Sequence, residues 1–336
     1  MQIEKRLLAV NRLTKAVATL IEDDRGLFST VAANNPWFSP DSTKRMLKGV
    51  LDQYLAEHLL INWLARYSSL DKKTENQVLG IVMAGNIPMV GFHDLLCGIV
   101  SGYQVKVKLS DKDSVLIPYL LKEAEIGADL VECIDRLPKC DRIIATGSNN
   151  SSRYFEYYFK DIPHLIRKNR TSVAVLDGSE SSESLQLLGD DILAYYGLGC
   201  RNVSTICVPQ DYNVDQLFDA ILPFESYQHH NKYFNNFEYT TALYLLNKED
   251  FKSNGFFIVR ESEELFSRIS TIHIRRYKAL DQVAGFLDKE DENIQCVATN
   301  ISGIEHSRRV SLGQCQQPTL SDYADGIDTM EFLSQN

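Results

Sequence analysis

Several features that mark common protein classes are missing from this sequence. Its seven cysteines include no Cys-x-x-Cys pair, which argues against a disulfide framework and a zinc site, so we expect no bound metal. No uninterrupted apolar run approaches the length of a membrane span, and residues 1–18 lack the apolar core of a secretory signal. We therefore expect a cytoplasmic protein without a membrane span.

Positive charge is also scarce. The net charge is −10, from 35 Lys and Arg against 45 Asp and Glu, and no basic stripe runs along the chain. Nucleic acids require a basic face for their phosphates, so we expect no nucleic-acid partner. We interpret the short basic clusters at residues 167–170 and 275–276 as solvated surface. The remaining composition, 44% hydrophobic and 24% charged, is typical of a globular chain that forms one large domain or two ordinary ones.

The order of apolar and amphipathic segments indicates the fold class. Helices are expected at residues 3–21 and 42–67, before the pattern changes near residue 77. Short apolar runs then alternate with helical patterns, which implies βαβ crossovers and a mainly parallel sheet. The expected strands are 78–84, 104–109, 129–134, 141–145, 172–176, 203–208 and 255–259, and the expected helices are 88–101, 114–126, 151–160 and 182–195.

One cysteine lies on a glycine-rich turn. Residues 195–204 read YYGLGCRNVS and place Cys200 between a helical pattern and the strand expected at 203–208. Glycine leaves the neighbouring side chain unobstructed, so Cys200 is a candidate nucleophile. An inert core thiol is the alternative, because cysteine is among the most buried residue types. Sequence position does not identify a general base among Asp177, Glu180 and Glu183, which lie near the start of the preceding helix.

Two further candidates follow the first two expected strands. Asn86, in the turn Gly85-Asn86-Ile87-Pro88, could donate its amide to an oxyanion, or bond to its own backbone as turn asparagines do. Lys108 closes the strand at 104–109 and could reach a ribose or phosphate. A surface lysine is the more common explanation.

A conventional dinucleotide fingerprint is absent, since no Gly-x-Gly-x-x-Gly occurs. Instead, the strand at 141–145 opens into a helix through Thr146, Gly147 and Ser148. Backbone N–H groups and the positive dipole end of that helix suit a pyrophosphate, and the two hydroxyls could add hydrogen bonds. The same three residues also make a common helix N-cap.

In this order the motifs resemble the aldehyde dehydrogenase superfamily, most closely the acyl-CoA reductases typified by the LuxC-type fatty acyl reductases. The resemblance covers roughly residues 77–330, and the segment 318–329 (PTLSDYADGIDT) resembles the acyl-CoA reductase branch specifically. It implies that Cys200 is the nucleophile and Asn86 the oxyanion asparagine. It further implies that Lys108 touches the cofactor ribose and that Thr146, Gly147 and Ser148 bind the pyrophosphate.

The resemblance also implies an α/β architecture with two domains. A Rossmann-type parallel-sheet domain for the nicotinamide cofactor is expected at residues 1–174, with 305–336 returning to it. A second α/β domain, at residues 175–304, would carry the catalytic cysteine. Residues 311–314 lie where the family has its closing loop.

The function implied is NADPH-dependent reduction of a fatty acyl thioester to the aldehyde through an S-acyl-cysteine intermediate. The thioester would be carried by CoA or by an acyl carrier protein, and the protein could form a homo-oligomer. NADH is not excluded: Lys108, Ser110 or Lys112 could meet a 2′-phosphate, whereas Asp111 would repel it.

Some residues depart from the family pattern. Hydrolytic aldehyde dehydrogenases carry a glutamate in a Glu-Leu-Gly-Gly stretch, and the corresponding residues 175–178 read VLDG, which favours a reductase. The Glu-x-Phe-Gly-Pro motif has only residues 252–257 as a counterpart, and the chain is shorter than typical members. An acyltransferase using Cys200, a hydrolytic aldehyde dehydrogenase and a non-enzymatic binding protein remain alternatives. The aromatic-rich segment 227–244 could line an acyl channel or form ordinary core.

Overall fold

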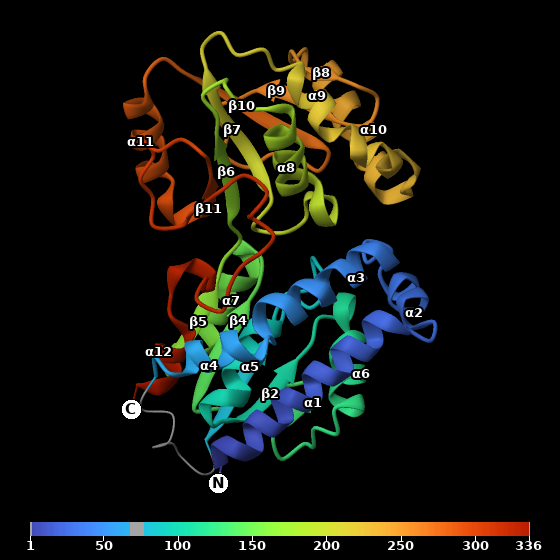
Figure 1. Cartoon of the computed structure of the whole chain (residues 1–336), viewed down its shortest axis with the longest axis vertical. Coiled ribbons are helices and arrows are strands. Elements are labelled where there is room, and N and C mark those ends of the chain that lie inside the picture. The colour runs from blue at the N-terminus through green and yellow to red at the C-terminus, as the bar shows by residue number, and fades with distance from the viewer. Residues whose placement is uncertain (1, 68–76, 336) are drawn as a thin grey trace. The chain divides into compact units, whose positions relative to one another are not determined.

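The computed structural model describes residues 2–67 and 77–335. The chain folds as two compact units, shown in Figure 1. Unit 1 comprises Met1–Asn169 and Pro318–Asn336, and unit 2 comprises Arg170–Gln317. The domain boundaries expected from the sequence fall after residues 174 and 304, whereas the units of the structure change after residues 169 and 317.

Unit 1 contains a five-stranded sheet in the order β3-β2-β1-β4-β5, in which all neighbouring strands are parallel. β1 and β4 have buried interiors, as parallel strands covered on both faces do, whereas β2 alternates the buried Val105 and Val107 with the partly buried Lys106. The strands are β1 (Val78–Val82), β2 (Gln104–Lys108), β3 (Val131–Cys133), β4 (Arg142–Thr146) and β5 (His164–Arg167).

Helices make up most of the rest of unit 1. They are α1 (Gln2–Glu22), α2 (Leu27–Asn34), α3 (Pro40–Gly49), α4 (Glu57–Leu64), α5 (Phe92–Ser101), α6 (Leu116–Glu123), α7 (Asn149–Tyr158) and α12 (Thr329–Ser334). The prediction of a single helix over residues 42–67 is wrong. A π-helical turn, η1 (Val50–Tyr54), and an extended Ala56 interrupt it, so that α4 runs separately and buries Leu60 and Trp63. Gly102, with φ of 107°, ends α5 as predicted.

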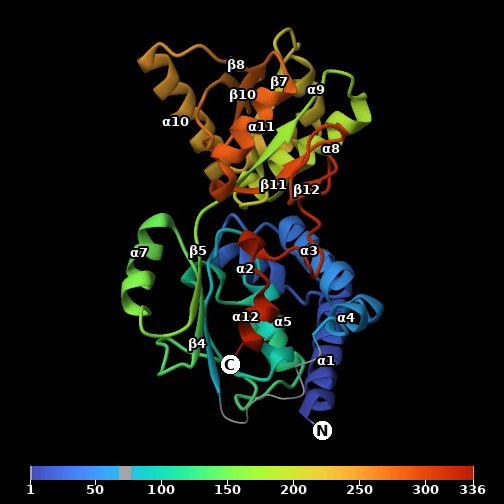
Figure 2. The same ribbon diagram turned by 90° about the vertical axis from the view of Figure 1, so that its left-hand side faces the viewer.

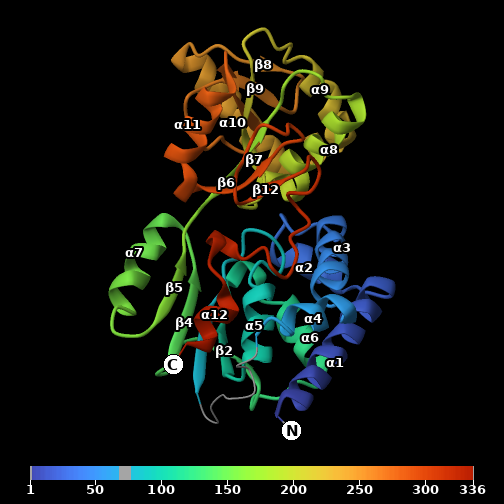
Figure 3. The same ribbon diagram turned by 60° about the vertical axis from the view of Figure 1, so that its left-hand side comes forward.

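The C-terminal segment completes the core of unit 1. Leu320, Met330 and Leu333 are at most 3% exposed and belong to the same hydrophobic cluster as α1, α5 and β1. Figures 2 and 3 show α12 beside α5. Residues at the end of the chain therefore supply apolar surface that the N-terminal part alone lacks.

A buried ion pair fixes the same segment. Arg167 is 4% exposed and forms a bidentate ion pair with Asp94. Its Nη2 lies 2.7 Å from Oδ1 and its Nε lies 3.1 Å from Oδ2. The guanidinium also donates to the Ala324 carbonyl at 2.7 Å and to Thr329 Oγ1 at 2.8 Å. The interpretation of the 167–170 cluster as solvated surface is wrong for Arg167, because the sequence does not show that a carboxylate from α5 meets it.

Unit 2 is built on a seven-stranded sheet in the order β12-β11-β6-β7-β10-β9-β8. All its strand pairs are parallel except β8 with β9. Figures 1 and 3 show α11 and α8 on opposite sides of β6 and β7. The strands are β6 (Thr171–Val175), β7 (Val203–Pro209), β8 (Lys252–Ser253), β9 (Ile258–Glu261), β10 (Thr271–Tyr277), β11 (Ile294–Ala298) and β12 (Arg309–Val310). The α-helices described in this unit are α8 (Ser182–Leu193), α9 (Gln216–Ile221), α10 (Asn231–Asn247) and α11 (Leu280–Lys289).

The predicted α/β class, with a parallel-sheet unit and a second α/β unit, is confirmed. Among the described helices, none is both long and apolar enough to cross a membrane.

Candidate functional site

Three of the predicted site segments meet at one edge of the sheet of unit 1. In the strand register, Val82 of β1 lies beside Lys108 of β2 and beside Ala145 of β4. Asn86 follows β1, Lys108 ends β2 and Thr146 ends β4, so the structure places them at the same carboxyl edge. The chain order also reverses between β1 and β4. Open α/β sheets bind their ligands at the carboxyl ends of strands where the order reverses.

The Asn86 turn packs closely on the loop that follows β2. The Met83 N–H donates to the Lys108 carbonyl at 2.9 Å, which extends the pairing of β1 with β2. A Cβ atom on Gly85 would lie 2.7 Å from Ser110 Oγ, so only glycine fits without a shift. The side chain of Asn86 itself is exposed at this edge.

A buried carboxylate holds the end of the same turn. Met89 adopts a left-handed conformation, with φ of 52°, and its N–H donates to Asp113 Oδ2 at 2.6 Å. Asp113 is 6% exposed, and Oδ1 has no hydrogen-bond partner within residues 2–67 and 77–335. Burial raises the pKa of Asp113 to about 6, against the lowering effect of the Met89 N–H. Asp113 was not predicted from the sequence, because it belongs to no recognisable motif.

The turn from β4 into α7 has both packing and capping roles. Ser148 is the N-cap of α7, and its Oγ accepts from the Ser151 N–H at 3.3 Å. A Cβ on Gly147 would lie 2.9 Å from both the Phe155 ring and Ser151, so glycine is needed for the close approach of the helix. The Gly147 N–H donates to the Arg167 carbonyl at 3.2 Å. The first turn of α7 is therefore the part of this motif suited to a pyrophosphate.

The side chains predicted to meet a cofactor 2′-phosphate lie at the end of β2 and on the anchored loop that follows it. Lys108, Asp111 and Lys112 are exposed there. Two side-chain amides from the end of α2 hold the loop: Asn34 donates to the Asp111 carbonyl and Asn35 to the Lys112 carbonyl, each at 3.2 Å. Two cations, one carboxylate and a helix N-terminus at one sheet edge fit a phosphate-bearing ligand.

Cys200 lies at the amino ends of β6 and β7 in unit 2. It is half-buried, in a turn closed by the Asn202 N–H donating to the Gly199 carbonyl at 3.0 Å. The Cys200 carbonyl accepts from Ser172 Oγ of β6 at 3.2 Å. The Ser172 hydroxyl also lies 3.0 Å from the sulfur of the buried Cys296. All seven cysteines are thiols.

The backbone before Cys200 is strained. The helix expected to end near Tyr196 ends at Leu193, and a short 3₁₀ turn follows. Tyr195, Tyr196 and Gly197 have φ of 52°, 60° and 75°, three consecutive left-handed residues. Each non-glycine residue in this region costs roughly 1–2 kcal/mol, and such strain clusters at functional sites.

Aromatic packing secures that strained stretch. The Tyr196 ring centroid lies 4.3 Å from that of Tyr227 and 4.5 Å from that of His230. Tyr227 belongs to η5 (Leu222–His229), and His230 is the N-cap of α10. Part of the aromatic-rich segment, including the buried Tyr233 with its ring centroid 6.2 Å from that of Tyr196, thus supports the chain just before Cys200, while Tyr244 packs in a separate core cluster.

The carboxylates near the start of α8 lie at the other edge of the sheet from Cys200. β6 leads to its carboxyl edge, where Glu180 accepts from the backbone N–H groups of Asp177 and Gly178 at 2.8 and 3.0 Å. The helix then returns along the sheet before the chain reaches Cys200. This placement argues against Asp177, Glu180 and Glu183 as the base that activates the thiol.

A second buried aspartate ties the expected closing loop to α8. Asp191 is fully buried and accepts from the Gly313 N–H at 2.6 Å and the Cys315 N–H at 2.9 Å. Burial raises its pKa to about 7. The Arg201 side chain, next to Cys200, donates to the Cys315 carbonyl. The loop at 311–315 is therefore attached both to α8 and to the turn that carries Cys200.

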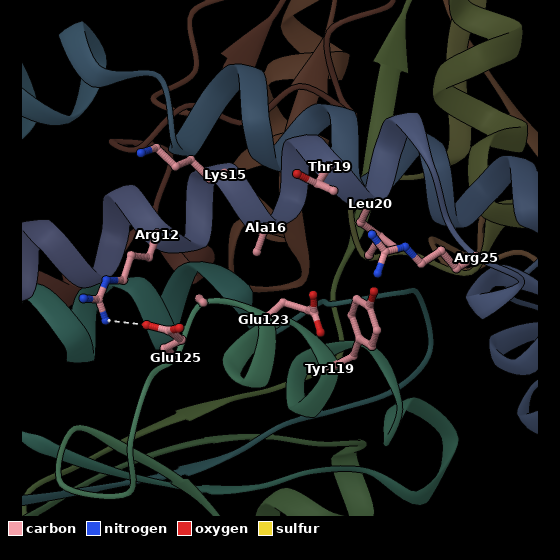
Figure 4. Close-up of a pocket in the computed structure, with 10 residues that line it drawn as sticks. Arg12, Lys15, Ala16, Thr19, Leu20, Arg25, Tyr119, Glu123 and Glu125 are labelled. Atoms are coloured by element: carbon pink, nitrogen blue, oxygen red, sulfur yellow. Dashed lines mark ion pairs between the residues drawn. The ribbon is translucent and has the colours of Figure 1, made fainter.

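A shallow pocket between α1 and α6 lies apart from these segments. It encloses about 220 Å³ and has an apolar floor that includes Ala16 and Leu20. Figure 4 shows the Tyr119 hydroxyl directed toward Arg25, and Arg12 paired with Glu125 at 3.4 Å. Its lining includes none of the predicted site residues.

Comparison with known proteins gives a fold but no close relative. No protein-family model matches the sequence, and no curated protein matches it. Solved structures do match. An oxidoreductase from Marinobacter aquaeolei aligns with a TM-score of 0.66 at 10% identity, covering 94% of this chain and 79% of that one.

Two dehydrogenases align over a similar extent. A NAD-dependent benzaldehyde dehydrogenase from Corynebacterium glutamicum has a TM-score of 0.60 at 12% identity, covering 88% of this chain and 77% of that one. An indole-3-acetaldehyde dehydrogenase from P. syringae, in complex with NAD⁺, has a TM-score of 0.54 at 12% identity, covering 90% and 77%. The chain therefore has an aldehyde-dehydrogenase-like fold, with a Rossmann-type parallel-sheet unit and a second α/β unit.

Proposed function

We propose that this protein is an oxidoreductase that reduces acyl thioesters to aldehydes with a nicotinamide cofactor. The observation that carries the proposal is the Cys200 turn, a half-buried thiol placed after three left-handed residues on an aldehyde-dehydrogenase-like fold. A thiol that only filled the core would not require a strained turn to present it. Nucleophilic cysteines accept acyl groups and release them readily.

Unit 1 is proposed to bind the cofactor. The first turn of α7, with Thr146 and Ser148 beside it, would hold the pyrophosphate, and Lys108 would contact the ribose. The two positive side chains Lys108 and Lys112 favour NADPH, and Asp111 keeps NADH possible. When bound, the reduced nicotinamide supplies the hydride needed for reduction.

The acylation step is assigned to this chain's own residues. The Cys200 thiolate would attack the thioester carbonyl, forming a carbon–sulfur bond to the enzyme and breaking the bond to the donor thiolate, which leaves and takes up a proton. Asn86 and the Cys200 N–H are proposed to stabilise the oxyanion. Removal of one such donor typically costs about a hundred- to thousandfold in rate.

Reduction rather than hydrolysis is proposed on the ground of sequence. Hydrolysis of an acyl-cysteine requires an activated water, and the segment in which hydrolytic relatives carry a glutamate contains Val175 and Leu176, both fully buried. Without a base to activate water, an acyl-enzyme would be hydrolysed more slowly and would stay available for hydride transfer. The donor thioester is proposed to be acyl-CoA or an acyl carrier protein.

The test is cofactor oxidation by the purified protein with acyl-CoAs of several chain lengths. NADPH and NADH are compared, and the aldehyde is identified directly. Cys200→Ala should abolish turnover, whereas Cys133→Ala, which removes a half-buried thiol of unit 1, should retain it. Acyl label retained on Cys200 without cofactor oxidation would instead indicate an acyltransferase. Fatty acid in place of aldehyde would indicate hydrolysis.

A further inference from the structure

The side chain of Asn202 caps the end of α8. Asn202 is 3% exposed, and its Nδ2 donates to the carbonyls of Asp191 at 3.1 Å, Ile192 at 3.2 Å and Ala194 at 2.9 Å. The last carbonyls of a helix have no partner within the helix. One buried amide therefore satisfies the end of the helix that leads toward Cys200.

The same residue also holds the peptide that precedes Cys200. Its Oδ1 accepts from the Gly199 N–H at 2.8 Å, and its backbone N–H donates to the Gly199 carbonyl at 3.0 Å. Its own carbonyl accepts from the Ser172 N–H of β6 at 3.0 Å. Asn202 thus joins the helix end, the turn and the sheet.

Only an amide side chain provides this set of contacts. It supplies two N–H donors and a carbonyl acceptor, whereas an aspartate of the same shape has no donor when ionised. The chain between the two anchored points contains the strained residues 195–197. If the amide is removed, the strain can relax, and the turn at 199–202 moves with it.

We infer that Asn202 is a positioning residue that holds the Cys200 turn against the end of α8 and thereby sets where the thiol lies. This inference rests on the proposed role of Cys200 as nucleophile. Asn202 acts through the backbone of the turn and is not assigned a contact with substrate. A misplacement of about 1 Å can cost about a hundredfold in rate.

The test uses the whole chain carrying Cys133→Ser. This substitution removes the half-buried thiol of unit 1, so that the reagents report on the half-buried Cys200. Asn202→Ala and the isosteric Asn202→Asp are compared with Thr299→Val. This control removes a buried hydrogen bond, from Thr299 Oγ1 to the Val175 carbonyl at 2.8 Å, at the other edge of the sheet. Alkylation of Cys200 by iodoacetamide and acylation of Cys200 by an acyl-CoA are both timed by mass spectrometry.

The expected result is a change of opposite sign in the two rates. Both Asn202 variants should be alkylated severalfold faster, because a released turn exposes the thiol, yet acylated about a hundredfold more slowly, because the thiol is misplaced. Thr299→Val should change neither rate beyond the effect of its own loss of stability. Alkylation rates of the Asn202 variants equal to that of Thr299→Val would overturn the inference.

Hydrogen exchange in the unmodified protein gives a test that does not require the variants to fold. The Gly199 amide should exchange as slowly as the amides of α8, because its partner is a buried side chain. Exchange as fast as in an exposed loop would contradict the inference. If no acyl-CoA reacts with any form of the protein while the alkylation difference holds, the positioning role stands and the proposed function fails.

Discussion

At the scale of single residues, buried carboxylates hold both candidate segments in place without taking part in any motif. Asp113 binds the Met89 N–H behind the Asn86 turn, and Asp191 binds the Gly313 and Cys315 N–H groups behind the Cys200 turn. Each is desolvated, and burial raises both pKa values, to about 6 and about 7. Ionisation of these groups therefore opposes folding.

The pH dependence of stability should reveal Asp113. Its pKa is raised from 3.8 to about 6, so the folded state binds the proton more tightly than the unfolded chain. Its contribution is fully present below pH 4 and is lost as the pH rises through 6. The free energy of unfolding of the wild type, measured in urea, should therefore fall between pH 4 and 6 relative to that of Asp113→Asn. A difference between the two proteins that stays constant over this range would contradict the assignment.

Residue-level reasoning located the glycine turns but not their supports. Gly85 and Gly147 are recognisable in the sequence because they interrupt strand-to-helix patterns. Asn202 is only two positions from Cys200, yet nothing in the sequence shows that its amide meets the carbonyls at the end of α8. The roles of Cys200, Asn86, Lys108, Thr146, Gly147 and Ser148 stay predictions.

At the scale of elements, buried parallel strands were predicted in some cases but not in all, since β11, buried at every position, was missed. β1 and β7 are apolar runs with buried interiors, and their sequence patterns indicated both. β10 (Thr271–Tyr277) was not predicted, since it contains Arg275 and Arg276. These cations reach Glu263 and Glu261 at 2.5 and 2.7 Å, so their charge is neutralised by residues on a neighbouring segment.

The end of α10 offers a stabilising substitution. Lys248 caps this helix with φ of 57° and is exposed. Glycine adopts this conformation without the steric cost that a side chain incurs, so Lys248→Gly should raise the free energy of unfolding by about 1 kcal/mol. Lys289→Gly, at a helical position in the last turn of α11, should lower it by about 1 kcal/mol. Urea unfolding of both variants measures the difference, and effects of equal sign would contradict the argument.

At the scale of the whole molecule, unit 1 depends on both ends of the chain. Its sheet comes from residues 78–167, but Leu320, Met330 and Leu333 fill its core, and Arg167 binds Ala324 and Thr329. Each buried aliphatic side chain contributes roughly 1.5–3 kcal/mol. Folded domains retain only about 5–15 kcal/mol in total.

Deletion of residues 318–336 should therefore unfold unit 1. The amides of β1, β2 and β4 should lose their protection against hydrogen exchange, while those of β6 and β7 in unit 2 remain protected. Met330→Ala is the milder control, and we expect it to lower the free energy of unfolding by about 2–5 kcal/mol. Full protection of β1 in the truncated chain would show that the C-terminal segment is not part of the core.

The sequence by itself determined the α/β class, a mainly parallel sheet and the order of the candidate motifs, because hydrophobic periodicity and glycine turns are local properties. Tertiary structure decided the rest. It showed that Arg167 is buried against Asp94 and that Asn202 anchors the Cys200 turn. These facts depend on contacts between residues far apart in the chain or on the direction of a single side chain. Neither produces a periodic pattern in the sequence.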